Sequence, residues 1–240
     1  MKILAFDTSN QAMSVAVVVD SVPVAETTLN QKKTHSEQLL PTIEHLMAVA
    51  KLTPADLDRV VVADGPGSYT GIRIAVTTAK TLAYTAGVAL VGISSLAALA
   101  AKVVGTPALI VPVMDARRQN VFAGIYQWHD GQLVSVVADR HLALADLLAE
   151  VKLLKQPAVF VGSDLPKFTS TIKETLGAQA SFSDDITSLP QASRLALLGA
   201  TAEVSDAFNF VPRYLRLTEA ETNWLKTHED KGQAAYVEKV

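Results

Sequence analysis

A glycine-rich segment between an apolar strand and a long helix is the part of the sequence best suited to bind an anion. It reads Gly-Pro-Gly-Ser-Tyr-Thr-Gly over residues 65–71 and is followed by Ile-Arg. Backbone amides and the helix dipole favour phosphate at such a position. The alternative is a tight connection that needs glycine for close packing and positive φ. The segment lacks the Gly-Lys-Ser/Thr ending of a Walker A loop, and it does not match the dinucleotide fingerprint.

The acidic turn Asp7-Thr8-Ser9 is a second candidate, placed directly after the first predicted strand. An acid with neighbouring hydroxyls can hold a magnesium-bound phosphate. The same residue types also form Asx and ST turns, so a purely local role is the alternative. The candidate phosphate or ligand loop comprises Asp7, Thr8, Gly65, Gly67, Ser68, Tyr69, Thr70, Gly71 and Arg73.

Patterns typical of other catalytic sites are missing from the sequence. The five histidines form no His-Glu-x-x-His motif, and a helix carrying both His35 and His45 would separate them by about 15 Å. Ser94 and Ser95 lie outside any Gly-x-Ser-x-Gly elbow. With no cysteine, thiol chemistry and disulfides are excluded. The sequence therefore predicts no catalytic residue and no metal site.

Length and composition describe a chain that can fold around its own core. Of 240 residues, 49% are hydrophobic and 19% are charged, and a chain of this size needs no disulfide or metal to hold it together. A net charge of −3 weighs against a free-standing nucleic-acid binder, while a local basic patch stays open. No window approaches the ~20 apolar residues of a membrane span, and the N-terminal apolar stretch is too short for a signal peptide. We expect a soluble, cytoplasmic protein.

The elements that must position these candidates fall into two similar halves. The first half predicts strands at 3–6, 12–19, 22–29, 59–63 and 88–93, with helices near 39–50, 72–86 and 95–104. The second half predicts strands at 108–113, 120–128, 133–137 and 158–162, with helices at 145–154, 166–176 and 192–203. Alternating strands and helices indicate an α/β fold. We expect an N-terminal lobe over 1–104, a C-terminal lobe over 105–218 and a polar tail over 219–240.

Five short motifs, in order and spread over residues 3–216, resemble the bacterial TsaB (YeaZ) family. They are Ile3-Leu4-Ala5-Phe6-Asp7-Thr8-Ser9, His35-Ser36-Glu37-x-x-Leu40-Pro41, the run from Gly65 to Arg73, Asp115-Ala116-Arg117, and Pro212-Arg213-Tyr214-Leu215-Arg216. The glycine-rich run is the most specific of these motifs. The resemblance implies an actin-like (ASKHA) fold of two ribonuclease-H-like lobes, which agrees with the duplicated order of elements.

The same resemblance implies a function in tRNA modification. It indicates a non-catalytic scaffold and activator in the complex that forms N6-threonylcarbamoyladenosine next to the anticodon. The implied partners are the catalytic TsaD paralogue, the TsaE ATPase, tRNA through the complex, and a second copy when the chain is alone. It implies no cofactor for the chain itself, although ATP or ADP could bind at the interface of the complex.

The alternative is an ATP-dependent small-molecule kinase of the actin-like superfamily, with Asp7 holding magnesium. Against it, Thr8 stands where such kinases usually have glycine after the acid.

The comparison with TsaD-like chains supports a non-catalytic role. Those chains carry Asn-His-x-x-Gly-His after the corresponding loop and helix, which places two histidines at i and i+4 as metal ligands. The matching stretch here is residues 92–99, Gly-Ile-Ser-Ser-Leu-Ala-Ala-Leu, with Ser95 and Leu99 at the ligand positions. Leucine cannot bind a metal ion, so we expect no metal centre and no transferase chemistry from this chain alone.

The helices then become the expected working surface. Residues 35–50 and 71–87 offer apolar and small side chains on more than one face, which suits packing against a partner's helices. In the resemblance, these helices mediate either a homodimer or the TsaB–TsaD heterodimer. The predicted contact residues, chosen by helical position, are His35, Gln38, Leu39, Thr42, Ile43, Leu46, Ile74, Thr78, Thr81 and Thr85.

Overall fold

In the computed structural model, which describes residues 1–31 and 35–216, the first lobe is built on a five-stranded sheet. Its order is β3-β2-β1-β4-β5, in which β1, β2 and β3 are antiparallel while β4 and β5 run parallel to β1. The apolar, β-branched runs of the sequence become these strands. Their bounds are β1 (Lys2–Asp7), β2 (Met13–Val19), β3 (Val22–Leu29), β4 (Arg59–Gly65) and β5 (Ala89–Ser94).

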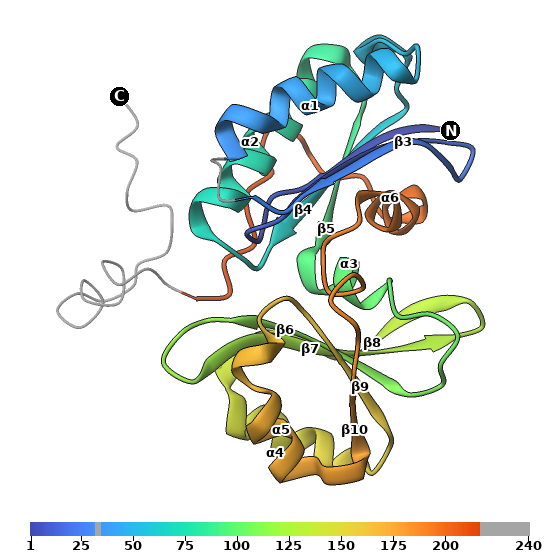
Figure 1. Ribbon diagram of the computed structural model, residues 1–240. Helices are drawn as coiled ribbons and strands as arrows, with labels where there is room; N and C mark the ends of the chain where they lie inside the picture. Colours follow the sequence, from blue (N-terminus) through green and yellow to red (C-terminus); the bar gives the residue numbers. More distant parts are fainter. Residues whose placement is uncertain (32–34, 217–240) are drawn as a thin grey trace, which may run out of the picture.

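Helices cover both faces of this sheet, so its strands are buried on two sides (Figure 1). Leu4 and Phe6 of β1 pack on the side of α1 (His35–Val49) and α2 (Tyr69–Ala86). The alternate residues Ile3 and Ala5 pack on the other side, against α6 (Ala192–Thr201). This follows from the two-residue period of a strand, which sends neighbouring side chains to opposite faces.

The ends of α2 are set by local sequence chemistry. Ser68 is its N-cap, and its side chain accepts a hydrogen bond from the Gly71 amide. At the other end Gly87 adopts a left-handed φ of 68° and donates its amide to the Ala83 carbonyl. Glycine is favoured there because it has no Cβ to clash. The helix is therefore held with its N-terminus beside the glycine-rich segment.

The second lobe repeats the plan of the first. Its sheet has the order β10-β9-β6-β7-β8, which matches the first sheet when read in the opposite direction. Here β6, β7 and β8 are antiparallel, while β9 and β10 continue parallel to β6. The bounds are β6 (Leu109–Asp115), β7 (Asn120–His129), β8 (Gln132–Ala143), β9 (Ala158–Val161) and β10 (Ala180–Phe182).

Three helices cover the second sheet. Helices α4 (Leu144–Leu154) and α5 (Thr169–Leu176) pack on its outer face, and α3 (Ser95–Ala100) packs on the face toward the first lobe (Figure 1). Leu96 and Leu99 of α3 share an apolar cluster with Ile110 and Tyr126 of the second sheet. Although α3 follows β5 directly in sequence, it contributes to the core of the second lobe.

The last described segment returns to the first lobe. Leu195 and Ala196 of α6 join the core of the first sheet. Beyond α6, the Ser205 amide donates to the Leu90 carbonyl at 2.8 Å, and the Arg213 amide donates to the Asp64 carbonyl at 2.8 Å. The expected division is corrected here, because residues 192–216 pack with the N-terminal lobe and not with a C-terminal lobe extending to residue 218. The expected tail, 219–240, lies outside the described residues.

Within residues 1–31 and 35–216, none of the helices has both the length and the apolar character required to cross a lipid bilayer.

Candidate functional site

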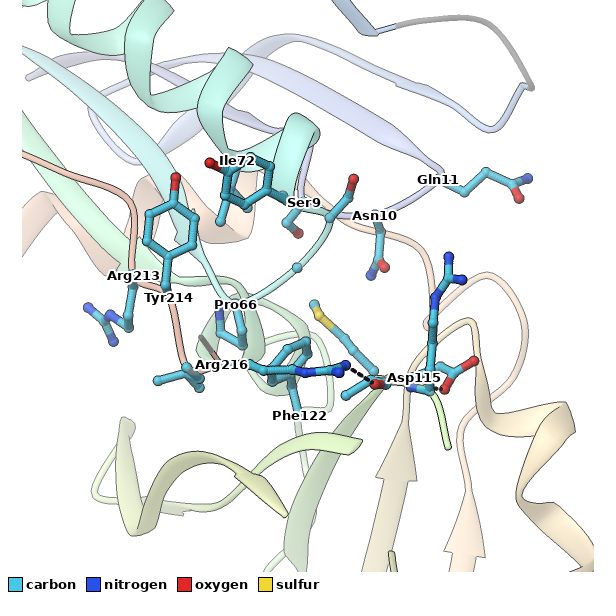
Figure 2. A pocket seen from close by; sticks show the side chains of 17 residues that line it. Ser9, Asn10, Gln11, Pro66, Ile72, Asp115, Phe122, Arg213, Tyr214 and Arg216 are labelled. Carbon is cyan, nitrogen blue, oxygen red and sulfur yellow. Dashed lines mark hydrogen bonds between the residues drawn. The ribbon is translucent and has the colours of Figure 1, made fainter. Parts of the chain in front are cut away.

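A cleft of about 470 Å³ opens between the two lobes. The first lobe contributes residues 9–11 and 66–69, the second contributes residues 114–117, and residues 213–216 of the returning segment close one side. Figure 2 shows side chains from all these segments around one space. The structure therefore brings together the acidic turn, the glycine-rich segment, Asp115-Ala116-Arg117 and the Tyr214 segment.

The glycine-rich segment packs against the acidic turn through backbone contacts. A Cβ on Gly71 would lie 2.1 Å from the Thr8 carbonyl oxygen, and one on Gly67 would lie 2.3 Å from the Ser9 carbonyl oxygen. The Ser68 amide donates to the Ser9 carbonyl at 2.7 Å. The Thr8 hydroxyl also donates to the Gly71 carbonyl at 2.7 Å. Close packing thus explains these two glycines without a ligand.

Gly65 is required for a related reason. Its φ is +123°, and a Cβ there would lie 2.5 Å from the Arg213 carbonyl oxygen. A side chain would be strained by the backbone conformation and would displace the returning segment. Of the candidate loop, Gly67, Ser68 and Tyr69 line the cleft and remain available to a ligand, whereas Thr70 is exposed on the first turn of α2.

Asp7 serves the turn and does not line the cleft. Its carboxylate is 3% exposed and accepts the Ser9 amide at 2.7 Å, which is the geometry of an Asx turn. Burial raises the pKa of Asp7 above its usual value, while hydrogen bonds from Ser9 act in the opposite direction. The local alternative for Asp7 therefore accounts for its contacts.

Arg73 ties α2 to the returning segment. Its Nε donates to the Tyr214 hydroxyl at 2.7 Å, and its guanidinium lies 4.5 Å from the centre of the Tyr69 ring. The Tyr69 and Tyr214 rings stack with centroids 5.4 Å apart. A cation and two rings thus form one assembly at the edge of the cleft.

Asp64, at the end of β4, is paired with Arg213 in a buried setting that sequence reasoning missed. The carboxylate is 5% exposed, and Arg213 Nη2 donates to its Oδ2 at 3.1 Å. Burial raises the pKa of Asp64 to about 6, although the Arg213 charge acts in the opposite direction. No local motif marks this pair, because its members are 149 residues apart.

We expect Asp64 to make the stability of the fold depend on pH. Its folded pKa of about 6 lies above the usual 3.8, so the folded state binds this proton more tightly than the unfolded chain. The stabilising contribution is therefore complete below about pH 4 and is lost as pH rises through about 6. Each unit of pKa difference corresponds to about 1.4 kcal/mol. Urea unfolding at several pH values should show this loss in the parent protein and not in Asp64→Asn; equal pH profiles would contradict it.

The carboxylates of the second lobe are also paired internally. Lys167 Nζ lies 2.7 Å from Asp115 Oδ2 and 2.8 Å from Asp164 Oδ1. Between the lobes, Asp139 accepts hydrogen bonds from Ser94 and Tyr126. Among residues 1–31 and 35–216, no group of three or more His, Asp or Glu side chains is arranged to hold a metal ion.

Ser95 and Leu99, the two positions singled out in the resemblance to TsaD-like chains, lie in α3. Ser95 is buried at the first position of the helix, and Leu99 is buried in the apolar cluster shared with the second sheet. Leu99 thus packs as core and offers no donor atom to a metal ion.

Helices α1 and α2 lie side by side on the outside of the first lobe (Figure 1). Three predicted contact residues, Leu39, Ile43 and Leu46, are at most 6% exposed because they fill the core against the first sheet, which corrects that part of the prediction. Thr81 and Thr85 are exposed, and the other predicted contacts, His35, Gln38, Thr42, Ile74 and Thr78, are partly exposed.

The apolar residues that these helices present to solvent are different ones. Leu40 and Val49 on α1 are 56% and 54% exposed, and Tyr84 on α2 is 78% exposed. Phe208 in the returning segment is 81% exposed, and its carbonyl accepts a hydrogen bond from Lys80 of α2 at 3.0 Å. We call Leu40, Val49, Thr81, Tyr84 and Thr85 the outer helix face. Leu40 and Val49 are half a turn out of phase and lie on opposite flanks of α1, so the outer helix face carries separate exposed apolar side chains and not one apolar patch.

Two lobes with the same ribonuclease-H-like strand order, enclosing a cleft between them, define the actin-like class of α/β proteins. Comparisons with known proteins place the chain within that class. A family model for TsaD, tRNA N6-adenosine threonylcarbamoyltransferase, matches residues 23–224. A Bacillus subtilis (strain 168) protein named tRNA threonylcarbamoyladenosine biosynthesis protein TsaB is 40% identical over 229 residues, covering 95% of this chain and 100% of that protein.

Two further matches point to the same family. The Escherichia coli (strain K12) protein of the same name is 30% identical over 145 residues, covering 57% of this chain and 62% of that protein. A Pseudomonas aeruginosa crystal structure, described as an uncharacterized protein with similarity to peptidase YEAZ, superposes with a TM-score of 0.77 at 25% identity, covering 90% of this chain and 99% of that one. The chain belongs to the TsaB (YeaZ) family.

Proposed function

We propose that this protein is a non-catalytic scaffold and activator subunit of the complex that forms N6-threonylcarbamoyladenosine on tRNA. It pairs with the TsaD paralogue and works with the TsaE ATPase. Membership of the TsaB family supports this, since relatives carry the name tRNA threonylcarbamoyladenosine biosynthesis protein.

The outer helix face carries this proposal. Leu40, Val49 and Tyr84 are each more than half exposed on two helices that lie together, although the chain has a complete core beneath them. Two neighbouring helices suit packing against a matching pair from a related chain, as in a helical bundle. An interface of this kind buries about 1,600 Å² or more. The same face serves a homodimer in isolation, so TsaD and a second copy compete for it.

The non-catalytic part of the proposal is supported by side chains at two places. Leu99 stands where TsaD-like chains carry a metal-binding histidine, and it is buried among apolar residues. Asp7, which a kinase would use for magnesium, is buried and hydrogen-bonded within its own turn. We therefore prefer a subunit over an ATP-dependent small-molecule kinase.

The protein acts in the cytoplasm and meets tRNA as part of the complex. ATP or ADP, where it takes part, binds at the interface of the complex and not as a resident cofactor of this chain.

Sedimentation velocity of the chain, of TsaD and of their mixture tests the pairing. We expect the free chain to sediment as a dimer at micromolar concentration and the mixture to form a one-to-one complex at the expense of that dimer. A mixture that sediments as the sum of its parts would contradict the proposed pairing.

A further inference from the structure

We infer that the cleft between the lobes binds a single-stranded segment of RNA directly, with phosphates on Arg117 and Arg216 and a base against Tyr214. The choice of RNA rests on the proposed function in tRNA modification. The inference goes beyond that function because it assigns this chain its own contact with RNA.

The charge in the cleft is positive despite the net negative charge of the chain. Arg117, Arg213 and Arg216 come from two separate segments and line the same space, and Figure 2 labels Arg213 and Arg216 there. Arg213 is paired with Asp64, and Lys167 is shared by Asp115 and Asp164. The positive charge at the cleft therefore rests on Arg117 and on Arg216, whose guanidinium also donates to the Ala116 carbonyl at 3.0 Å. Guanidinium groups match phosphate geometry, and a positive groove is the usual electrostatic feature of RNA binding.

An aromatic platform borders the same space. Tyr214 is 42% exposed, and its ring already stacks on Tyr69 at a centroid distance of 5.4 Å. The hydrogen bond from Arg73 to the Tyr214 hydroxyl, 2.7 Å long, holds the ring in place. A half-exposed, fixed ring is a surface on which an unpaired base can stack.

The acidic turn adds polar groups to the wall of the cleft. Ser9 is fully buried and its hydroxyl lowers the pKa of Asp7, so this side chain serves the turn itself. Asn10 and Gln11 follow it and line the cleft. Figure 2 shows Ser9 and Asn10 on the same side of the space.

The engagement of the carboxylates near the cleft favours a phosphodiester as its ligand over a magnesium-bound nucleoside triphosphate. Asp7 does not line the cleft, and its Oδ1 accepts the Ser9 amide. Asp115 does line it, but its two oxygens are engaged by Lys167 Nζ and by the Arg117 amide. A polyphosphate with its cation needs acidic ligands that are free to bind the cation. A phosphodiester carries one negative charge per unit and is matched by arginine alone.

Fluorescence anisotropy with a labelled, unmodified anticodon stem-loop RNA, the full chain and its complex with TsaD tests the inference. We expect saturable binding that weakens with KCl. Arg117→Gln should lower the slope of log Kd against log [KCl] by about 0.7, the value for one lost phosphate contact on single strands. Tyr214→Leu should weaken binding about fivefold or more, whereas Tyr214→Phe, which keeps the ring, should stay within about twofold.

Lys152→Gln, an exposed lysine on α4 of the second lobe, serves as the matched charge control and should leave binding unchanged. Thermal unfolding of each variant confirms that the fold is kept. The inference is overturned by an absence of RNA binding, by variants that bind as tightly as the parent, or by MgATP that displaces the RNA from the cleft.

Failure of this inference can be told apart from failure of the proposed function by measuring TsaD pairing on the same samples. If the chain pairs normally with TsaD but Arg117→Gln and Tyr214→Leu leave its RNA affinity unchanged, only the proposed cleft contact is overturned. If these variants lose RNA affinity but the parent chain does not pair with TsaD, the cleft contact is supported and the scaffold function is contradicted.

Discussion

Replacing Tyr84 by glutamate is expected to weaken pairing with TsaD, and self-association, by about 30-fold or more. Tyr84 is 78% exposed on α2, flanked by Thr81 and Thr85 of the outer helix face. Burying a carboxylate in an apolar helix interface leaves it unpaired, and large aromatic anchors contribute about 2 kcal/mol or more to such interfaces. Isothermal titration calorimetry with TsaD measures the effect directly.

Leu153→Glu is the matched control for this change. Leu153 is 77% exposed, almost as much as Tyr84, but lies on α4 at the outside of the second lobe (Figure 1). It should pair with TsaD as the parent does. An equal loss in both variants would mean that added negative charge, and not the outer helix face, is responsible. An unchanged affinity for Tyr84→Glu would remove that face from the interface.

Gly71→Ala is expected to lower the free energy of unfolding by about 3 kcal/mol. The new methyl group at the start of α2 would lie 2.1 Å from the Thr8 carbonyl oxygen, a backbone atom of the turn that follows β1. Relief requires the helix to move away from the turn, which breaks the hydrogen bond from the Thr8 hydroxyl to the Gly71 carbonyl. Substitutions that overpack a core and force such backbone shifts give the large losses seen in mutant series.

Gly87→Ala separates steric clash from conformational strain. Gly87 has a left-handed φ of +68°, but a Cβ there would meet no atom within 4 Å from residues beyond its local chain neighbours, so its cost should stay near 1 kcal/mol. Urea unfolding of the three proteins gives the comparison. Similar losses at both glycines would contradict the close approach of the glycine-rich segment to the acidic turn.

Hydrophobic periodicity predicted most of the secondary structure and the α/β class. The duplicated order of strands became two sheets with the same arrangement. The strand β10 was missed because it has three residues and no apolar run, and only its parallel pairing with β9 makes it a strand. The return of α6 to the first lobe was also missed, since periodicity shows that a helix has an apolar face but not which sheet receives it.

The candidate site was predicted in part. Motif reading located the segments that meet at the cleft, but it left open whether the glycines and Asp7 serve a ligand or the local fold, and contacts within the chain account for them. It could not find the pairs Asp64 with Arg213 and Asp115 with Lys167, because these contacts join residues far apart in sequence. Helical position alone also could not separate Leu39, which faces the core, from Leu40, which faces solvent.

The most direct test of the central claim is reconstitution of the modification from purified components. TsaD, TsaE, threonylcarbamoyl-adenylate, ATP and unmodified tRNA are combined with and without this chain, and labelled threonine is counted on the tRNA. If the chain is a non-catalytic activator, label appears only when the chain and TsaD are both present, and the chain alone gives none. Tyr84→Glu should strongly reduce the label. Label that is independent of the chain, or that the chain produces without TsaD, would contradict the account.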